Sequence, residues 1–236
     1  MIFIAGRKRL ILVIFSCLLA LSLFLHHEES ENVFSFKQTK RIVIDAGHGL
    51  PDGGAVGMNG TIESTLNIKI AKLVEKSLTK KGYSVIMTRT DESAVSDEGK
   101  TLAQRKRNDM YKRLETINSS DADMFVSIHM NKFTDSRYFG AQVIYSDNFV
   151  QSEQLAAFIQ SRLCALKENQ SKRTHSKAPS GIFLLKNAKI PAVIVECGFL
   201  SNYDEEKLLN TPEYQKSISV AIIKGIEDFY KKGAQL

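Results

Sequence analysis

The sequence predicts a single α/β domain with a mostly parallel sheet and helices on both of its faces. Short β-branched runs alternate with segments of helical periodicity, which is the order expected of parallel strands joined by helices. The first and last of these runs, Arg41–Asp45 and Ala192–Glu196, are almost continuously apolar, as central strands buried on both faces are. The 236 residues are 43% apolar, which excludes a disordered chain and is enough for a full core.

Six short runs rich in β-branched residues are predicted to be strands. The predicted strands are Arg41–Asp45, Tyr83–Thr88, Met124–Ile128, Gln142–Tyr145, Ile182–Leu185 and Ala192–Glu196.

Apolar residues that recur every three or four positions predict the helices between these runs. The first helix ends at Lys81-Gly82, because glycine commonly follows the last turn of a helix. Another helix is expected over about Thr101 to Asn118. The stripes that predict the remaining helices are Leu66, Ile70, Leu73 and Leu78 for the first, Leu155, Ile159, Leu163 and Leu166 for the third, and Ile218, Ala221, Ile222, Gly225, Ile226 and Phe229 for the last.

Residues 1–40 are interpreted as an export signal or membrane anchor followed by a tether, and residues 41–236 as the folded catalytic domain. Arg7, Lys8 and Arg9 directly precede the uncharged run Leu10–Leu25, the order of an export signal. The basic residues stay in the cytoplasm, so the domain is expected outside it. Sixteen residues are fewer than the ~18 of a typical membrane span, yet no clear small-residue cleavage site follows. An uncleaved anchor over residues 7–25 is favoured, and a cleaved signal peptide stays open.

Charge and cysteine content exclude further classes. The formal net charge is +6, and residues 1–40 hold five basic and three acidic groups, which leaves about +4 for the domain. No basic stripe interleaved with aromatic residues is present, so nucleic acid is not an expected partner. Three cysteines do not form a disulfide scaffold. A bond between Cys164 and Cys197 is permitted outside the cytoplasm but not indicated by spacing, and Cys197 is expected to be a buried thiol.

Polar residues follow three of the predicted strands at their carboxyl ends, where open α/β sheets bind ligands. His48 follows the first strand in the segment Asp45-Ala46-Gly47-His48-Gly49, His129 follows the third, and Glu196 closes the last. Glu63 opens the first helix after a loop with five glycines, which permit the tight turns needed to return the chain to the strand end. If the strands are parallel and central, these four side chains converge.

Two histidines and a glutamate form a ligand set suited to zinc, and three protein ligands leave a position for water. The metal would acidify that water and polarise a carbonyl, while a further glutamate supplies the acid and base of amide cleavage. Each residue also has a simpler explanation: His48 in a plain turn, His129 in the core, Glu63 as a helix cap. Glu196 is the hardest to explain this way, because a carboxylate in a core strand is costly unless paired or coordinated.

Several segments together resemble the signature blocks of the zinc-dependent N-acetylmuramoyl-L-alanine amidases. They are IVIDAGHGLPDGGAVG, then Glu63, then VIMTR, DADMFVSIHMN and PAVIVECGFLSN, spread in order over about 41–230. The resemblance implies zinc ligands at His48, Glu63 and His129, a catalytic acid/base at Glu196, and a twisted, mostly parallel six-stranded sheet. It also implies Zn²⁺ as the cofactor and peptidoglycan as the substrate.

Within that family, the chain is most similar to the sporulation-type, germination-specific cortex amidase. The features that carry this similarity are the short build, the membrane-directed N-terminus, the lack of wall-binding repeats and the segment EGKTLAQRKRNDMYKR. That subtype removes peptides from muramic acid so that muramic-lactam can form, which implies an extracytoplasmic location at the developing spore envelope. Many members have proline where this chain has Ala46, and the 66 residues between His129 and Glu196 are too few for the autoinhibitory helical insert of some members.

Two alternatives from other classes stay open at this point. One is a zinc peptidase that cuts within the stem peptide. The other is a non-catalytic wall-binding protein of the same fold, or an enzyme that needs an activating protein partner before it binds metal or substrate.

Overall fold

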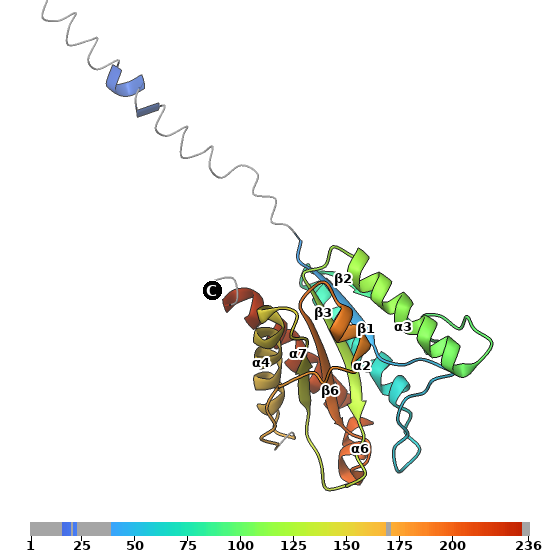
Figure 1. The fold of residues 1–236 in the computed structure, drawn as a ribbon. Coiled ribbons are helices and arrows are strands. Elements are labelled where there is room, and N and C mark those ends of the chain that lie inside the picture. The colour runs from blue at the N-terminus through green and yellow to red at the C-terminus, as the bar shows by residue number, and fades with distance from the viewer. Residues whose placement is uncertain (1–15, 20, 23–38, 169–170, 233–236) are drawn as a thin grey trace, which may run out of the picture. The chain divides into compact units, whose positions relative to one another are not determined.

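The computed structural model describes residues 16–19, 21–22, 39–168 and 171–232, and the chain divides into two units, residues 1–38 and 39–236. Six strands of the second unit form one sheet (Figure 1). They are β1 (Arg41–Ala46), β2 (Ser84–Met87), β3 (Met124–Asn131), β4 (Gln142–Tyr145), β5 (Ser176–Lys177) and β6 (Ala192–Phe199). Their spatial order is β2-β1-β3-β6-β4-β5.

The sheet is mostly parallel, as predicted. Every neighbouring pair of strands is parallel except β4 and β6, which run antiparallel. The strands β1, β3 and β6 lie side by side at the centre, and their interior residues are almost all buried. This placement explains their continuous apolar character, because helices cover both faces of the sheet there.

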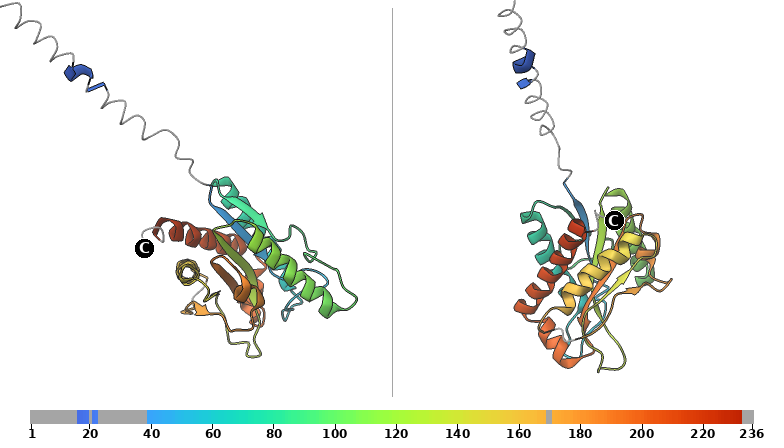
Figure 2. Two further views of the ribbon diagram at one scale, coloured as in Figure 1. Left: turned by 45° about the horizontal axis from the view of Figure 1, so that its top comes forward. Right: turned by 90° about the vertical axis from the view of Figure 1, so that its left-hand side faces the viewer.

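Helices lie on both faces of the sheet (Figure 2). One core cluster joins β1, β3 and β6 to α2, α4 and α7, and a second cluster on the opposite face joins the sheet to α3 and α5. Predicted helices over residues 66–81, 101–118, 155–166 and 218–229 are confirmed. The helices are α2 (Glu63–Lys80), α3 (Leu102–Ser119), α4 (Val150–Cys164), α5 (Phe183–Asn187), α6 (Tyr203–Leu209) and α7 (Pro212–Lys232).

The prediction of a strand at Ile182–Leu185 is wrong, because this run belongs to helix α5. A four-residue apolar run does not distinguish a strand from a buried helical turn. Leu184 and Leu185 are buried in the core cluster on the α3 face instead of entering the sheet. The strand that takes its place in the sheet is β5, the two-residue polar segment Ser176–Lys177, which pairs with β4 at the edge.

The predicted export segment, residues 7–25, lies mostly outside the described residues; only 16–19 and 21–22 are described, and these are helical. Among the residues that the structure describes, no helix is both apolar enough and long enough to span a membrane. The anchor and the domain boundary after residue 40 stay predictions. The described cysteines are free, and Cys197 is buried in the core as expected.

Helices α4 and α7 approach each other closely at Gly225, where an added Cβ would lie 2.5 Å from the Cα of Ile159. Backbone atoms cannot move aside as a side-chain end can, so we expect Gly225→Leu to lower the free energy of unfolding by about 1–3 kcal/mol. The midpoint of urea unfolding measures this. The neighbouring exposed position provides the control, Lys224→Leu, and equal midpoints for the two variants would contradict the close contact as the cause.

Candidate metal centre

The turn after β1 presents His48 in an unusual backbone conformation. His48 has a φ of 59°, in the left-handed region that non-glycine residues rarely adopt. Arg113 of α3 donates a hydrogen bond to the carbonyl oxygen of His48, and the amide of Gly47 donates to the carbonyl of Ile128 on β3 at 3.0 Å. Such conformations persist only where the surroundings hold them, and they cluster at functional sites.

Glu63 is the first residue of α2 and is buried, as the sequence predicts for a helix that begins beside the strand end. Its Oε2 accepts a hydrogen bond from the amide of Ala55 at 2.8 Å, and its Oε1 accepts one from the amide of Met130 at 3.1 Å. Gly54 passes so close that an added Cβ would lie 2.5 Å from Glu63 Oε2, and its φ of +72° also favours glycine. The loop is therefore shaped around the carboxylate.

The same loop is held from the other side by Glu206 of α6. The Glu206 carboxylate accepts hydrogen bonds from the amides of Asn59, at 2.9 and 3.0 Å, and Thr61, at 3.2 Å. An added Cβ on Gly57 would lie 2.2 Å from Glu206 Oε1, so glycine allows the carboxylate to sit against the backbone. Glu206 thus fixes the loop that leads into Glu63.

His129 lies within β3, which continues to Asn131 beyond the predicted end of the strand. It is opposite Glu196 in the register of β3 and β6, so the two side chains lie beside each other on one face of the sheet. The register shifts between His129 and Asn131, an irregularity of the kind that often aims a side chain into a site.

The structure brings the three predicted ligands together. The side-chain ligand atoms of His48, Glu63 and His129 lie within 4.8 Å of one another. His48 Nε2 is 3.4 Å from Glu63 Oε2, and His129 Nδ1 is 3.0 Å from Glu63 Oε1. Two imidazole nitrogens and one carboxylate at this spacing fit the donor set of a zinc ion with three protein ligands.

The electrostatics of the pocket also fit a cation. Burial alone would raise the pKa of Glu63, but the hydrogen bond to His129 and the charges of both histidines lower it to about 2. Burial alone would lower the pKa of His129, yet the carboxylates of Glu63 and Glu196 raise it. The pocket therefore favours positive charge, which a metal ion would supply in place of protons on the imidazoles.

Glu196 lies beside this cluster and is not one of its three members. Burial raises the pKa of Glu196 to about 7, against the opposing charge of His129. Within the part of the chain that the structure describes, its buried Oε2 has no hydrogen-bond partner. A buried carboxylate oxygen without a partner is costly in a purely structural role, and a pKa near neutrality suits a general base that later acts as an acid.

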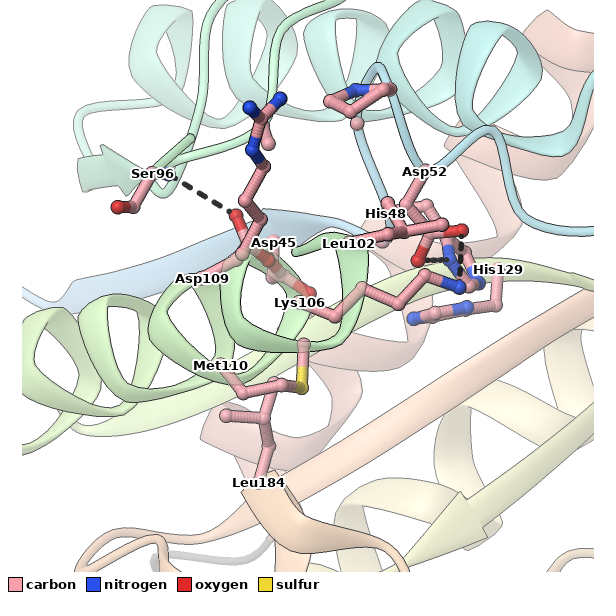
Figure 3. Close-up of a pocket in the computed structure, with 15 residues that line it drawn as sticks. Asp45, His48, Asp52, Ser96, Leu102, Lys106, Asp109, Met110, His129 and Leu184 are labelled. Carbon is pink, nitrogen blue, oxygen red and sulfur yellow. Dashed lines mark hydrogen bonds and ion pairs between the residues drawn. The ribbon is translucent and has the colours of Figure 1, made fainter. Parts of the chain in front are cut away.

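A cavity of about 220 Å³ adjoins the two histidines (Figure 3). It lies between the turn after β1 and the N-terminal half of α3, and Leu184 of α5 also lines it. Apolar and charged side chains both line it, so a ligand there would meet a mixed surface beside the metal centre. The lining residues that Figure 3 labels are Asp45, His48, Asp52, Ser96, Leu102, Lys106, Asp109, Met110, His129 and Leu184.

The sequence analysis did not predict the residues that contact the turn around His48 and hold it in place. Asp52 contacts His48, and Arg113 joins the turn to α3. Arg89, which follows β2, donates to the backbone carbonyls of Ala46 and Gly47. The sequence does place Asp52 near His48, because both belong to the segment GHGLPDGG. In contrast, no local pattern in α3 indicates that Arg113 contacts the turn.

The fold and the site define an α/β protein with a candidate metal centre of two histidines and one carboxylate, and a second carboxylate, that of Glu196, beside it. The chain belongs to the N-acetylmuramoyl-L-alanine amidase family, whose model matches residues 42–228. The resemblance that the sequence blocks indicate is therefore confirmed.

Similar proteins include the germination-specific N-acetylmuramoyl-L-alanine amidase of Bacillus subtilis, 35% identical over 231 residues, which are 95% of this chain and 96% of that protein. Another is LytC, an N-acetylmuramoyl-L-alanine amidase of the same organism, 30% identical over 80% of this chain but only 35% of its own length. Among solved structures, the CwlD amidase of Clostridioides difficile in complex with the GerS lipoprotein superposes with a TM-score of 0.79 and 38% identity, covering 82% of this chain and 99% of that one.

Proposed function

We propose that this amidase, which hydrolyses the amide bond between N-acetylmuramic acid and L-alanine in peptidoglycan, uses a zinc ion held by His48, Glu63 and His129. Glu196 is the proposed general base and acid. The observation that carries the proposal is the convergence of three ligand atoms within 4.8 Å beside a carboxylate whose buried oxygen has no partner.

In this mechanism, Glu196 takes a proton from the attacking water and then delivers it to the leaving nitrogen of L-alanine. This role is supported by the position of Glu196, which is opposite His129 on the neighbouring strand and therefore lies beside the ligand cluster. Bound zinc supplies a Lewis acid that polarises the carbonyl and lowers the pKa of water. The hydrogen bond to His129, the charges of both histidines and the amide of Ala55 keep Glu63 ionised, so Glu63 does not compete with Glu196 for the proton.

We further propose that the chain acts in the spore cortex, where removal of the peptide leaves muramic acid free to form muramic-lactam. The support is the 35% identity to a germination-specific amidase along nearly the whole of both chains. The amidase acts outside the cytoplasmic membrane in this proposal, attached through residues 7–25 if that segment is retained. Because the similar CwlD amidase was solved with the GerS lipoprotein, a lipoprotein is the proposed class of activating partner.

Removal of zinc is the direct test of the metal. Dialysis against a chelator is expected to abolish hydrolysis of purified peptidoglycan, and added Zn²⁺ is expected to restore it. Metal analysis of the purified protein is expected to find about one zinc per chain, the number that one three-ligand site holds. A fully active, zinc-free preparation would refute the proposed cofactor. Assays with and without the candidate lipoprotein separate a missing partner from a missing metal.

Mass analysis of the released fragments distinguishes the amidase from a zinc peptidase of the stem peptide. An amidase is expected to release the whole stem with a free L-alanine amino group and to leave muramic acid without a peptide. Shortened stems that remain attached to the sugar would instead identify a peptidase. A sample that releases nothing in the presence of zinc and partner would favour the non-catalytic wall-binding alternative.

A further inference from the structure

We propose that Asp52 and Lys106 form a positioning pair that orients the imidazole of His48 toward the metal, an inference that rests on the zinc site proposed above. Neither residue belongs to the three-ligand cluster. Asp52 lies in the loop after β1, whereas Lys106 lies on α3, far along the chain. The pair therefore connects α3 to a metal ligand.

The two ring nitrogens of His48 face two different carboxylates. Nδ1 lies 3.2 Å from Asp52 Oδ2, and Nε2 lies 3.4 Å from Glu63 Oε2. A carboxylate at Nδ1 favours the tautomer that carries its proton there, which leaves the lone pair of Nε2 free for the metal. Histidines that bind metals commonly donate their second N–H to such a partner, which fixes the ring and raises its basicity.

Lys106 holds the other oxygen of the Asp52 carboxylate. Its Nζ is 2.9 Å from Asp52 Oδ1, and the amide of Gly54 donates to the same oxygen at 3.3 Å. With Oδ1 held by these two donors, Oδ2 faces Nδ1 of His48. Figure 3 shows Asp52 and Lys106 meeting beside His48 at the edge of the cavity.

The second histidine has a different support. His129 packs against Gly47, where an added Cβ would come within 2.1 Å of Nε2, and its Nδ1 lies against Glu63. Its orientation is therefore set by β3 and by close packing on the backbone. Loss of the Asp52 carboxylate should thus act on His48 and leave His129 in place, which makes the effect on the metal partial.

The test measures the affinity of the purified full chain for Zn²⁺ by competition with a chromophoric chelator. Asp52→Ala is expected to weaken zinc binding by about 10–100-fold. Asp52→Asn should weaken zinc binding less, because an amide oxygen can still accept a hydrogen bond from the Nδ1–H group of His48. Lys106→Met should shift the affinity in the same direction by a smaller factor. The absorption bands of bound Co²⁺ should change in Asp52→Ala, because they report ligand geometry and not overall stability.

Lys112→Met is the matched control, since Lys112 lies on the same helix and its ammonium pairs with the exposed Glu115, away from the metal centre. It should keep wild-type zinc affinity. Folded Asp52→Ala with wild-type affinity and an unchanged Co²⁺ spectrum would overturn the proposal. If Asp52→Ala does not fold, an unchanged affinity in Lys106→Met overturns the pair. His48→Ala distinguishes a failure of the positioning pair from a failure of the zinc site. If this variant retains full zinc affinity, the proposed zinc site itself is wrong.

Discussion

Replacing Glu196 by glutamine is expected to lower the rate of amide hydrolysis by at least about 100-fold, the smallest factor typical of a general acid–base residue. The substitution preserves the size of the side chain but removes the group that accepts and returns the proton. Zinc should stay bound with near wild-type affinity, because Glu196 is not one of the three clustered ligands. Steady-state hydrolysis of purified peptidoglycan, together with metal analysis of the same sample, measures both effects.

Stability provides the third measurement on the Glu196→Gln variant. The buried Oε2 has no partner and burial raises the pKa of the group to about 7, so the native carboxylate is held at a cost. The neutral amide is therefore expected to leave the free energy of unfolding unchanged or increased. Substantial residual activity with zinc bound would show that another residue handles the proton. Loss of zinc would instead place Glu196 among the ligands.

The candidate site was predictable because its residues follow apolar strands. His48, His129 and Glu196 were identified by their positions at the carboxyl ends of three runs, and the parallel order of β1, β3 and β6 brings those ends to one edge. Glu63 was found because a glycine-rich loop precedes the helix that it opens. These inferences depend on hydrophobic periodicity, which the sequence carries locally, and on the alternation of strands and helices, which predicts a parallel sheet.

The residues behind the site were not predictable in the same way. Arg113 and Lys106 read as ordinary solvated charges in a helix rich in Lys and Arg, yet one is fully buried and the other contacts Asp52. Which side of α3 faces the turn after β1 is decided by packing between distant segments. The apolar run Ile182–Leu185 failed for a related reason, because burial alone is compatible with either a strand or a helix.

Replacing Arg113 by methionine is expected to lower the free energy of unfolding by about 3–5 kcal/mol, the usual result of removing one partner from a buried ion pair. Its Nε donates to Asp109 Oδ2 at 2.7 Å, and its Nη1 donates to Asp45 and to the carbonyl of Ala46. Arg113 and Asp45 are both fully buried, so the loss of Arg113 leaves a buried carboxylate without its charge partner. The loss would be a large part of the 5–15 kcal/mol typical of a folded protein.

The effect should depend on pH in a defined direction. Burial alone would raise the pKa of Asp45, but Arg113, with Ser127 and Thr88, lowers it, so in the native protein ionised Asp45 adds stability above its unfolded pKa of about 3.9. Without Arg113, burial dominates and the folded form prefers the neutral acid. The difference in stability between the native protein and Arg113→Met should therefore be greatest near neutral pH and shrink as the pH falls toward 4.

A second substitution identifies the uncompensated charge as the cause. Adding Asp45→Asn to Arg113→Met removes the buried carboxylate, so the double variant should regain part of the stability that the single variant loses, measured by urea unfolding.

Arg137→Met is the control, because Arg137 forms an exposed pair with Asp135, and it should unfold at the wild-type midpoint. If Arg113→Met also unfolds at the wild-type midpoint, the ion pairs and hydrogen bonds of Arg113 add no net stability. If Arg113→Met is destabilised but Asp45→Asn restores nothing, the cause lies in the other lost bonds of Arg113, those to Asp109 and to the carbonyls of Ala46 and His48.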